Sequence, residues 1–563
     1  MLIKDELKFT KYISLSLVII TVFILTAPVS DPVNVTKFLV LGILSLGSLG
    51  WNSYKKYVEL WDTEKPILLS LIFFTLSSVI AVVFSAEPIV QNLYGLYGRN
   101  TGLLTYVFLA ILLYATLSWK NSKSFSIYLF GFLAAGMLNI LYGIWVSIFG
   151  DFIPWTNNYG ALLGTFGNPD FAGAFLGMLS GVLLSVLFIA KHKWQRLLAL
   201  ILLFLNIFTV LETKTTQGIL VFGISISASF SYFLYSKFSK FKIHKYFLLS
   251  FTLIAMLTLI GMFQKGPLAD LVYKRSISLR GIYWDAALKT GNTHILTGVG
   301  MDGFGNWFRQ VRSVKAATWF PGPGVVTNVA HNIYLDMYAS GGLILLAAFT
   351  FFNFYAGWRL FELLKAKKEF DWIVASLTSI YFGYQAQAII SINQIGLGVW
   401  GWTIIGVICA YERLSREQNQ KQKIMKINNR KTKQYSEDKS IVLVPIFMLL
   451  GLLLALPPFV ADAKWTSALK FKDLRKLEES LRPSYFTPSS SERLANAVII
   501  LSQNNLDDQA YVYAKQGVKF SSNYFDAWNM LYYARKSTDS DRKIALENMK
   551  RLDPNNRTLD KLK

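Results

Sequence analysis

Long hydrophobic runs recur along most of the chain, and no other feature constrains its fold as strongly. Each run has roughly 17 to 25 residues, the length that a helix needs to cross about 30 Å of hydrocarbon. The runs are centred near residues 20, 44, 76, 110, 137, 181, 204, 226, 255, 345, 382, 404 and 450. The sequence therefore predicts an all-α, polytopic membrane protein with about thirteen transmembrane helices.

The first run, from about Lys11 to Val29, follows Lys4 and Lys8, as the hydrophobic part of a signal peptide would. It lacks a clear small-x-small cleavage site, and another run follows at once. We therefore expect a retained membrane anchor.

The formal charge of +23 is spread through short clusters between the runs. A nucleic-acid partner would need the basic residues gathered in one domain, so we expect none. The only cysteine, Cys409, lies within a run, which excludes a disulfide framework and a Cys-based metal site.

The positions of the basic residues predict the orientation, because lysine and arginine in short loops resist translocation. With the N-terminus in the cytoplasm, the short external loops hold only Arg99 and Lys214. The short cytoplasmic segments hold the others, among them Lys55, Lys120, Lys191, Lys193, Lys240, Lys245, Arg359 and Lys365. This predicts a multi-pass protein of the inner (cytoplasmic) membrane, with a large external loop over residues 264–331 and an extracytoplasmic tail.

The external loop carries two arginines whose position suggests a specific role. Arg275 and Arg280 immediately precede an expected amphipathic helix around Trp284–Leu288. The planar fork of arginine suits bidentate phosphate binding, so we expect both to hold a phosphate group. The lysines of the loop are expected to be solvated or paired with anionic lipid headgroups.

The composition becomes that of a soluble domain after residue 461, so we divide the chain into a membrane domain, 1–461, and a tail, 462–563. Helical periodicity predicts helices over Ser491–Gln503, Asp507–Phe520, Asn523–Arg535 and Asp541–Leu552. The tail resembles tetratricopeptide repeats, which stack into a solenoid with a concave binding face. With few repeats, the stack is expected to lean on the membrane domain or on a preceding helix over Ala463–Leu481. It serves either as a docking platform for a protein partner or acceptor glycan, or as a stabilising cap.

Several motifs occur in order along the membrane domain, namely LYGLYGRNTGLLTY (Leu93–Tyr106), GTFGNPDFAGAFL (Gly164–Leu176), RGIYWDAAL, TGVGMDGFGNWF and AHNIYLDMYASGG. Together they resemble motifs of the O-antigen ligase and polymerase family of bacterial envelope glycan transferases. The resemblance covers about residues 60 to 410. It implies a helical, GT-C-like fold that transfers a glycan from undecaprenyl pyrophosphate to a glycan, lipid or protein acceptor, without a metal or other cofactor.

The resemblance also implies roles for individual residues. His331, in the His-Asn motif, is expected to be catalytic as a base or to orient the acceptor, because an imidazole with an ordinary pKa near 6.5 is mostly neutral at pH 7. Arg280 is expected to stabilise charge on the leaving pyrophosphate. Substrate binding is expected of the remaining candidates, which are Arg275, Arg99, Lys214, Gln217, Asn168, Asn332 and Asp336. For Arg99, anchoring at the membrane interface is an equal alternative. Asp336 is expected either to orient the imidazole of His331 or to hold the acceptor.

One motif departs from the family. Many members carry Ser-Arg-Gly at the external end of a middle helix, where the arginine is thought to hold phosphate. Here the stretch is ETKTTQGILV, so Gln217 stands at the arginine position. Lys214, three residues earlier, is a candidate for the missing charge.

The leading hypothesis is therefore a membrane glycosyltransferase that acts as a ligase. A surface polysaccharide polymerase and a protein O-oligosaccharyltransferase use the same donor and remain alternatives. A transporter of lipid-linked glycan and a structural scaffold are less favoured, because the sequence shows neither paired ionisable residues at the midplane nor inverted repeats.

Overall fold

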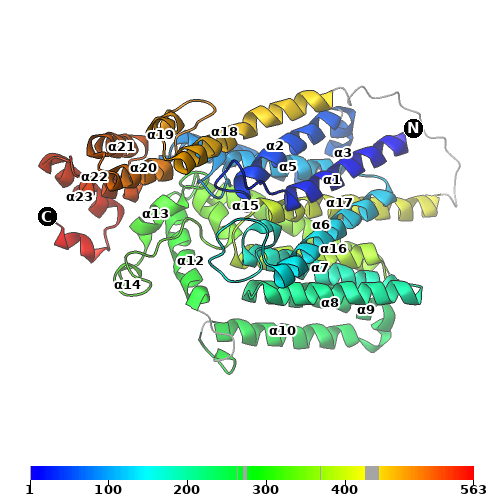
Figure 1. Ribbon diagram of the computed structural model, residues 1–563. Helices are drawn as coiled ribbons and strands as arrows, with labels where there is room; N and C mark the ends of the chain where they lie inside the picture. The colour runs from blue at the N-terminus through cyan, green and yellow to red at the C-terminus, as the bar shows by residue number, and fades with distance from the viewer. Residues whose placement is uncertain are drawn as a thin grey trace.

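The computed structural model describes residues 2–52, 54–262, 264–269, 275–367, 369–424 and 443–562 (Figure 1). Ten helices in this part of the chain are long and apolar enough to cross a membrane. The protein is therefore an all-α, polytopic membrane protein, and the described residues contain no strand beyond one isolated bridge between Ser484 and Thr487. The ten helices are α2 (Asn34–Trp51), α3 (Tyr54–Val83), α6 (Ser122–Phe149), α7 (Pro169–Ile189), α8 (Lys193–Glu212), α9 (Thr216–Phe238), α15 (Ile333–Ala366), α16 (Trp372–Ile390), α17 (Ile395–Ile424) and α18 (Leu443–Phe471).

Helices also cover the other three predicted centres, in α1 (Leu2–Val22), α5 (Leu103–Leu117) and α10 (Ile243–Met262). α1 begins with charged residues, and α5 and α10 have shorter apolar stretches, so the count of thirteen spans stays a prediction. The predicted end of the first run, near Val29, was wrong. The chain leaves the helix after Val22 and forms a loop, in which Pro28 and Pro32 lack the N–H groups that a continuing helix needs.

The long helices form an antiparallel bundle, so their connections gather at two ends (Figure 1). The first, which we call the tail end, holds the loop after α1, the segment between α10 and α15, and the C-terminal tail. The second, which we call the far end, holds the N-terminus and the basic connections near residues 120, 191 and 240.

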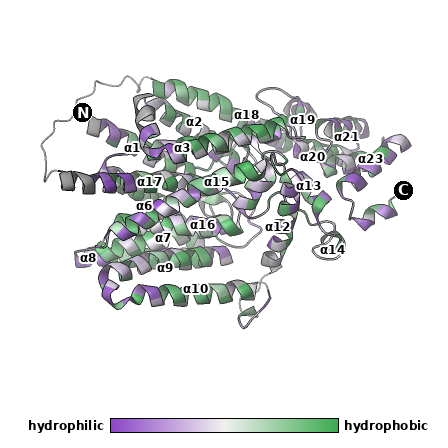
Figure 2. Ribbon diagram, turned by 180° about the vertical axis from the view of Figure 1, so that it is seen from behind, coloured by the Kyte–Doolittle hydropathy of each residue, from purple (hydrophilic) through white to green (hydrophobic). Residues whose placement is uncertain are grey.

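The core of the bundle surrounds α17, whose apolar stretch is entirely buried and carries Trp400 and Trp402. In contrast, α8 and α10 expose large apolar side chains such as Phe204 and Ile254. In Figure 2 much of α10 has the green of hydrophobic residues. This distribution is expected when lipid, rather than water, surrounds the outer helices.

Three helices lie between α10 and α15, namely α12 (Arg275–Thr293), α13 (Phe304–Val311) and α14 (Val314–Thr318). α12 contains the helix predicted at Trp284–Leu288, which is confirmed. Its Tyr283 packs against Phe308 of α13, with ring centroids 5.7 Å apart.

A break in α15 holds this segment against the bundle. The chain departs from helical geometry at Gly342, whose φ is +70°. The N–H groups of Val299 and Gly300 donate to the carbonyls of Ala339 and Ser340 at 2.9 and 3.0 Å. Backbone groups at the break are thus satisfied by the motif TGVGMDG of the long segment.

The tail consists of α19 (Leu474–Leu481), α20 (Ser491–Gln503), α21 (Asp507–Phe520), α22 (Phe525–Tyr533), α23 (Asp539–Leu552) and the short η4 (Arg557–Lys561). The four helices predicted from periodicity are therefore present. The single helix predicted over Ala463–Leu481 was wrong, because α18 continues to Phe471 and α19 starts afresh after Asp473, which caps it. Trp465 and Ala468 of α18 belong to the hydrophobic core of the tail, so the tail leans on this helix as expected.

Candidate functional site

A cavity of about 870 Å³ opens at the tail end of the bundle. It is lined by the loop after α1, the loop that holds Arg99, the loop before α7, His331, and the turn 391–394. Three predicted site residues, Arg99, Asn168 and His331, are among the lining residues. Ligand pockets commonly have volumes of about 300 to 1,000 Å³, so this cavity is the candidate site.

His331 is held by α12. Its ring stacks on Tyr283, with centroids 5.5 Å and planes 27° apart, and its carbonyl accepts a hydrogen bond from Trp284 Nε1 at 3.4 Å. Its φ of +53° lies in the left-handed region, which histidine adopts more readily than most residues. Burial, with the nearby cations Arg99 and Arg280, lowers the pKa of His331 to about 3. The imidazole is therefore neutral at pH 7, with one nitrogen that accepts a proton or a hydrogen bond.

Arg99 lies in a loop that the long segment fixes. The carboxylate of Asp302 accepts hydrogen bonds from the backbone N–H of Leu96 at 2.8 Å and from the hydroxyl of Thr101 at 3.0 Å. Among the described residues, no carboxylate pairs with the Arg99 guanidinium within 4.0 Å. The carboxylates of Asp302 and Asp336 are near enough to interact electrostatically with Arg99, but neither forms an ion pair with it, so its donors are available to an anionic ligand.

Arg280 lies on α12, three residues before Tyr283 in the sequence. Burial lowers the pKa of Arg280, and the carboxylate of Asp170 opposes this shift. The charge of Arg280 acts on His331, although Arg280 is not among the lining residues. Arg275 is the first residue of α12, and its side chain lies outside the described part of the structure.

Asn168 starts α7 at the wall of the cavity. Its side-chain oxygen accepts a hydrogen bond from the N–H of Asp170 at 2.9 Å, and its amide nitrogen lies 3.4 Å from the hydroxyl of Tyr159. This N-cap, followed by Pro169, fixes the first turn of α7.

Lys214 and Gln217 do not line the cavity, but each supports a segment that does. The Lys214 amine donates to the carbonyl of Gly160 at 2.7 Å, which holds the loop before α7. Gln217 Nε2 donates to the carbonyl of Asp170 at 3.3 Å. In this geometry the Lys214 amine is committed to a backbone carbonyl and does not line the cavity.

Asn332 and Asp336 hold the start of α15. The side chain of Asn332 accepts a hydrogen bond from the N–H of Leu335 at 3.1 Å and caps the helix. Asp336 Oδ1 accepts from the N–H of Ala330 at 2.7 Å. In the described structure Asp336 thus acts on the backbone just before His331, not on its imidazole.

Sequence reasoning missed Asp31, which follows α1 and lines the cavity. Its Oδ1 accepts from the N–H groups of Val33 and Asn34, at 3.1 and 2.9 Å, whereas its Oδ2 is buried without a partner among the described residues. The Nε2 atom of Gln394, which also lines the cavity, is likewise buried without a hydrogen-bond partner among the described residues. Unpaired buried polar atoms at a cavity mark positions where a ligand can supply the partner. The available signal was an acidic residue next to Pro32, between two hydrophobic runs.

The described residues contain no group of three or more His, Cys, Asp or Glu side chains placed to hold a metal ion. Neither a family model nor a curated protein matches this chain. Its function is therefore argued from the motifs and from the geometry of the cavity.

Proposed function

We propose that this protein is a membrane glycosyltransferase of the O-antigen ligase type. It transfers a glycan from undecaprenyl pyrophosphate to an envelope acceptor on the outer face of the cytoplasmic membrane. The observation that carries the proposal is that Arg99 and His331 share one cavity, with Arg280 close enough to act on the imidazole. These three residues come from three of the motifs that resemble the family.

The proposed topology has thirteen spans in a GT-C-like arrangement, with the tail end outside the cell. It is supported by the basic connections at the far end, such as those holding Lys120, Lys191 and Lys240, because lysines in short loops stay in the cytoplasm. The cavity then opens toward the outer surface, where a lipid-linked donor and an envelope acceptor can meet.

The reaction breaks the bond between the sugar C1 and the pyrophosphate oxygen and joins C1 to the acceptor hydroxyl oxygen. The bonding electron pair leaves with the lipid pyrophosphate, and the hydroxyl proton passes to a base. Negative charge grows on the leaving oxygens, and Arg99 and Arg280 stabilise it. A hydrogen bond to a charged group is worth roughly 1.5 to 3 kcal/mol, so two arginines supply a useful part of the rate enhancement.

The donor itself makes His331 a better base. A pKa of about 3 is far below pH 7, whereas a base works best when its pKa is near the working pH. Two neighbouring arginines contribute to this low pKa. The negative charge of a bound pyrophosphate offsets theirs and raises the pKa of the imidazole, so proton acceptance becomes coupled to donor binding.

The acceptor decides the subclass. Transfer to a finished lipid or glycan acceptor makes the protein a ligase, transfer to another donor-linked glycan makes it a polymerase, and transfer to side chains makes it a protein O-oligosaccharyltransferase. All three use the same donor chemistry and the same cavity.

The test is a reconstituted reaction with undecaprenyl-pyrophosphate glycan and with glycan, lipid and protein acceptors. We expect His331→Ala to slow transfer by about 100-fold or more while donor binding is largely retained. Arg535→Gln is the matched control, because this exposed arginine of the tail pairs with Asp507 and does not line the cavity, and it should leave the rate within about twofold. A ladder of products identifies a polymerase and a single adduct a ligase.

Two outcomes contradict the proposal. One is release of lipid pyrophosphate at the same rate in wild type and His331→Ala. The other is no transfer by the wild type to any of the three acceptors, which would favour a transporter of lipid-linked glycan.

A further inference from the structure

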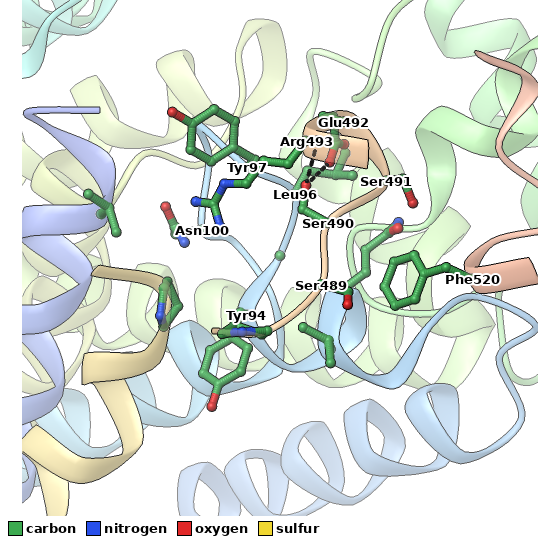
Figure 3. Close-up of a pocket in the computed structure, with 16 residues that line it drawn as sticks. Tyr94, Leu96, Tyr97, Asn100, Ser489, Ser490, Ser491, Glu492, Arg493 and Phe520 are labelled. Carbon is green, nitrogen blue, oxygen red and sulfur yellow. Dashed lines mark hydrogen bonds between the residues drawn. The ribbon is translucent and has the colours of Figure 1, made fainter. Parts of the chain in front are cut away.

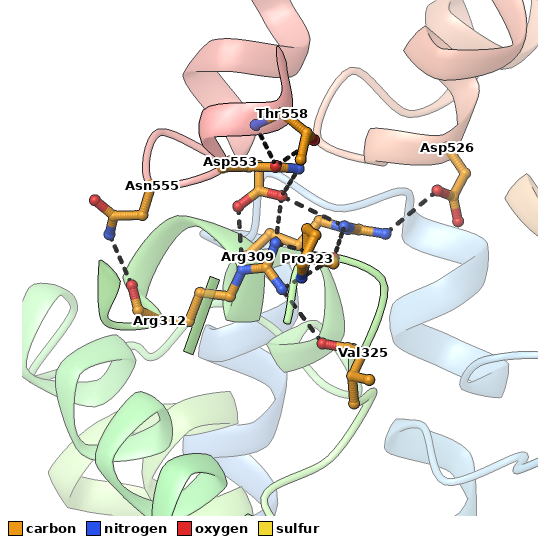
Figure 4. Close-up of polar contacts among 9 residues, drawn as sticks. Arg309, Arg312, Pro323, Val325, Asp526, Asp553, Asn555 and Thr558 are labelled. Carbon is orange, nitrogen blue, oxygen red and sulfur yellow. Dashed lines mark hydrogen bonds and ion pairs between the residues drawn. The ribbon is translucent and has the colours of Figure 1, made fainter. Parts of the chain in front are cut away.

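The tail is fastened to the long segment by a buried ion pair (Figure 4). Arg312 donates through Nη2 and Nε to the two carboxylate oxygens of Asp553 at 2.5 and 3.1 Å, and the side chains are only 1% and 0% exposed. Arg309 lies 3.4 Å from the same carboxylate and 3.6 Å from Asp526. Removing one partner of a buried pair typically costs about 3 to 5 kcal/mol. The tail is therefore held in one position.

A second contact joins the tail to the wall of the cavity. Asp462 of α18 is fully buried. Its Oδ2 accepts hydrogen bonds from the N–H groups of Ser30 and Asp31 at 2.9 and 3.0 Å, and its Oδ1 accepts from the hydroxyl of Tyr97 at 2.8 Å. Arg493 of α20 lies 3.6 Å from the same Oδ1 and 4.8 Å from the centre of the Tyr97 ring. Asp462 is thus the point at which the tail, the loop after α1 and the Arg99 loop meet.

The Arg99 loop is consequently clamped on two sides. On one side Asp302 holds Leu96 and Thr101, as described above. On the other side Asp462 and Arg493 hold Tyr97, which lines the cavity two residues before Arg99. The second side of the clamp includes a residue of the tail.

A small pocket at this seam raises the alternative of a second ligand site (Figure 3). Ser491 Oγ and Arg493 Nε line it and are buried without a partner among the described residues, and Tyr94 and Phe520 supply aromatic rings. Its volume is about 50 Å³. One water needs about 10 to 15 Å³ on this scale, so the pocket has room for a few waters but not for a sugar ring. The seam is therefore a contact between domains.

We propose that the tail positions the donor site, with Arg493 acting through Asp462 and Tyr97 to fix the Arg99 loop. Arg493 is a positioning residue, because it is committed to Asp462 and does not line the large cavity. Displacement of a binding group by about 1 Å weakens a site strongly, so loss of the clamp has to show in ligand binding. The anionic nature of the ligand rests on the proposed function, whereas the clamp itself rests on the contacts above.

The test uses the full chain in lipid nanodiscs, with farnesyl pyrophosphate as the probe. We expect Arg493→Gln to weaken probe binding about 5- to 10-fold, in the range typical of coupled neighbours. Arg535→Gln is the matched control, because Arg535 is an exposed tail arginine whose ion pair with Asp507 lies away from the seam, and it should change nothing. In an Arg99→Gln background, Arg493→Gln should have no further effect, because the group it positions is gone.

Hydrogen exchange of residues 96–101 supplies a readout that needs no ligand. We expect these amides to exchange faster in Arg493→Gln than in Arg535→Gln. If Arg493→Gln fails to fold, Tyr97→Phe replaces it in this measurement. Tyr97→Phe removes only the hydroxyl that reaches Asp462, and it should have the same effect.

Unchanged exchange overturns the positioning role, and so does an equal loss of probe binding in the wild-type and Arg99→Gln backgrounds. If the wild type binds no pyrophosphate while exchange still responds, the proposed function fails and the clamp stands.

Discussion

Arginines at the far end of the bundle and Arg99 at the cavity of the tail end differ in whether they pair with a carboxylate. At the far end, Glu64 accepts from Arg359 at 3.1 Å and from Arg413 at 2.9 Å, and Glu412 also pairs with Arg359. Arg413 uses its remaining donors on the carbonyls of Leu117 and Trp119 at 2.8 and 3.0 Å. At the tail end, by contrast, Arg99 lines a cavity with no carboxylate partner among the described residues.

The difference separates a structural cluster from a binding site, although both contain arginine. The far-end charges neutralise one another and fasten α3, α15 and α17 together, which stabilises the bundle only as long as every partner is present. Arg99, in contrast, forms no ion pair within 4.0 Å among the described residues, and its loop is held through the backbone of Leu96 and the side chains of Tyr97 and Thr101. Composition alone cannot tell these two cases apart.

The largest expected effect comes from Glu64→Gln, which leaves Arg359 and Arg413 without their shared carboxylate. We expect it to lower the free energy of unfolding by about 3 to 5 kcal/mol, measured by thermal unfolding in detergent. Glu362→Gln, on the surface of α15 in an exposed pair with Lys365, is the control and should cost less than about 1 kcal/mol. An unchanged melting temperature for Glu64→Gln would mean that the cluster does not hold the bundle.

The tail-end arginines should behave in the reverse manner. We expect Arg99→Gln to weaken binding of a prenyl pyrophosphate by about 10- to 100-fold, because it loses a charge-assisted contact worth roughly 1.5 to 3 kcal/mol. Arg280→Gln should weaken binding less, because Arg280 does not line the cavity and acts on the site as a nearby charge. Their melting temperatures should fall less than that of Glu64→Gln, because neither arginine forms an ion pair within 4.0 Å among the described residues, although the charge of Asp170 acts on Arg280. Arg535→Gln, which changes an exposed arginine of the tail away from the cavity, should bind as the wild type does. Equal binding by all three variants, measured by calorimetry, would remove the arginines from the site.

These two cases also show what the sequence can and cannot predict. Hydrophobic length and helical periodicity are local, so they located the spans and the tail helices, including α20 and α21 with their observed bounds. The motifs located Arg99 and His331. The partners of these residues are not local, because Asp302 binds the Arg99 loop across about two hundred positions and Asp462 binds Ser30 across more than four hundred. Which buried charges find partners depends on such contacts, and only the fold supplies them.

The pH dependence of stability tests the environment of His331. Its pKa is about 3 in the folded protein against 6.5 as the ordinary value, so the unfolded chain binds more protons between these limits. Stability therefore rises with pH across this window, by up to about 1.4 kcal/mol per pH unit, and is complete above pH 6.5. We expect His331→Asn to lose this slope when unfolding is measured from pH 4.5 to 7.5. Equal slopes in the two proteins would show that the imidazole is not buried beside cations.

Glu87 offers the comparison with the smallest expected effect, and the most discriminating one. It is a buried acid at the tail end whose hydrogen-bond donors are amides, whereas the donors to Glu64 are arginines. Its Oε2 accepts from Asn306 Nδ2 at 2.5 Å, and burial raises its pKa from 4.5 to about 7. The folded protein thus binds more protons between pH 4.5 and 7, so stability falls as pH rises through this window, opposite in sign to His331 and over a narrower range.

Glu87→Gln should remove that decline, as measured by unfolding from pH 5 to 8, while Glu479→Gln, an exposed acid of the tail, should retain it. The side chain of Asn523 in the tail also hydrogen-bonds to Glu87 and lowers its pKa, so this contact favours the ionised acid. Protonation of Glu87 should therefore weaken the contact between the tail and the bundle. A decline that persists in Glu87→Gln would show that the acid is ionised throughout. An ionised Glu87 would need a cation near it, as Glu64 has. The difference in pairing between the far end and the cavity would then hold for the arginines but not for these two acids.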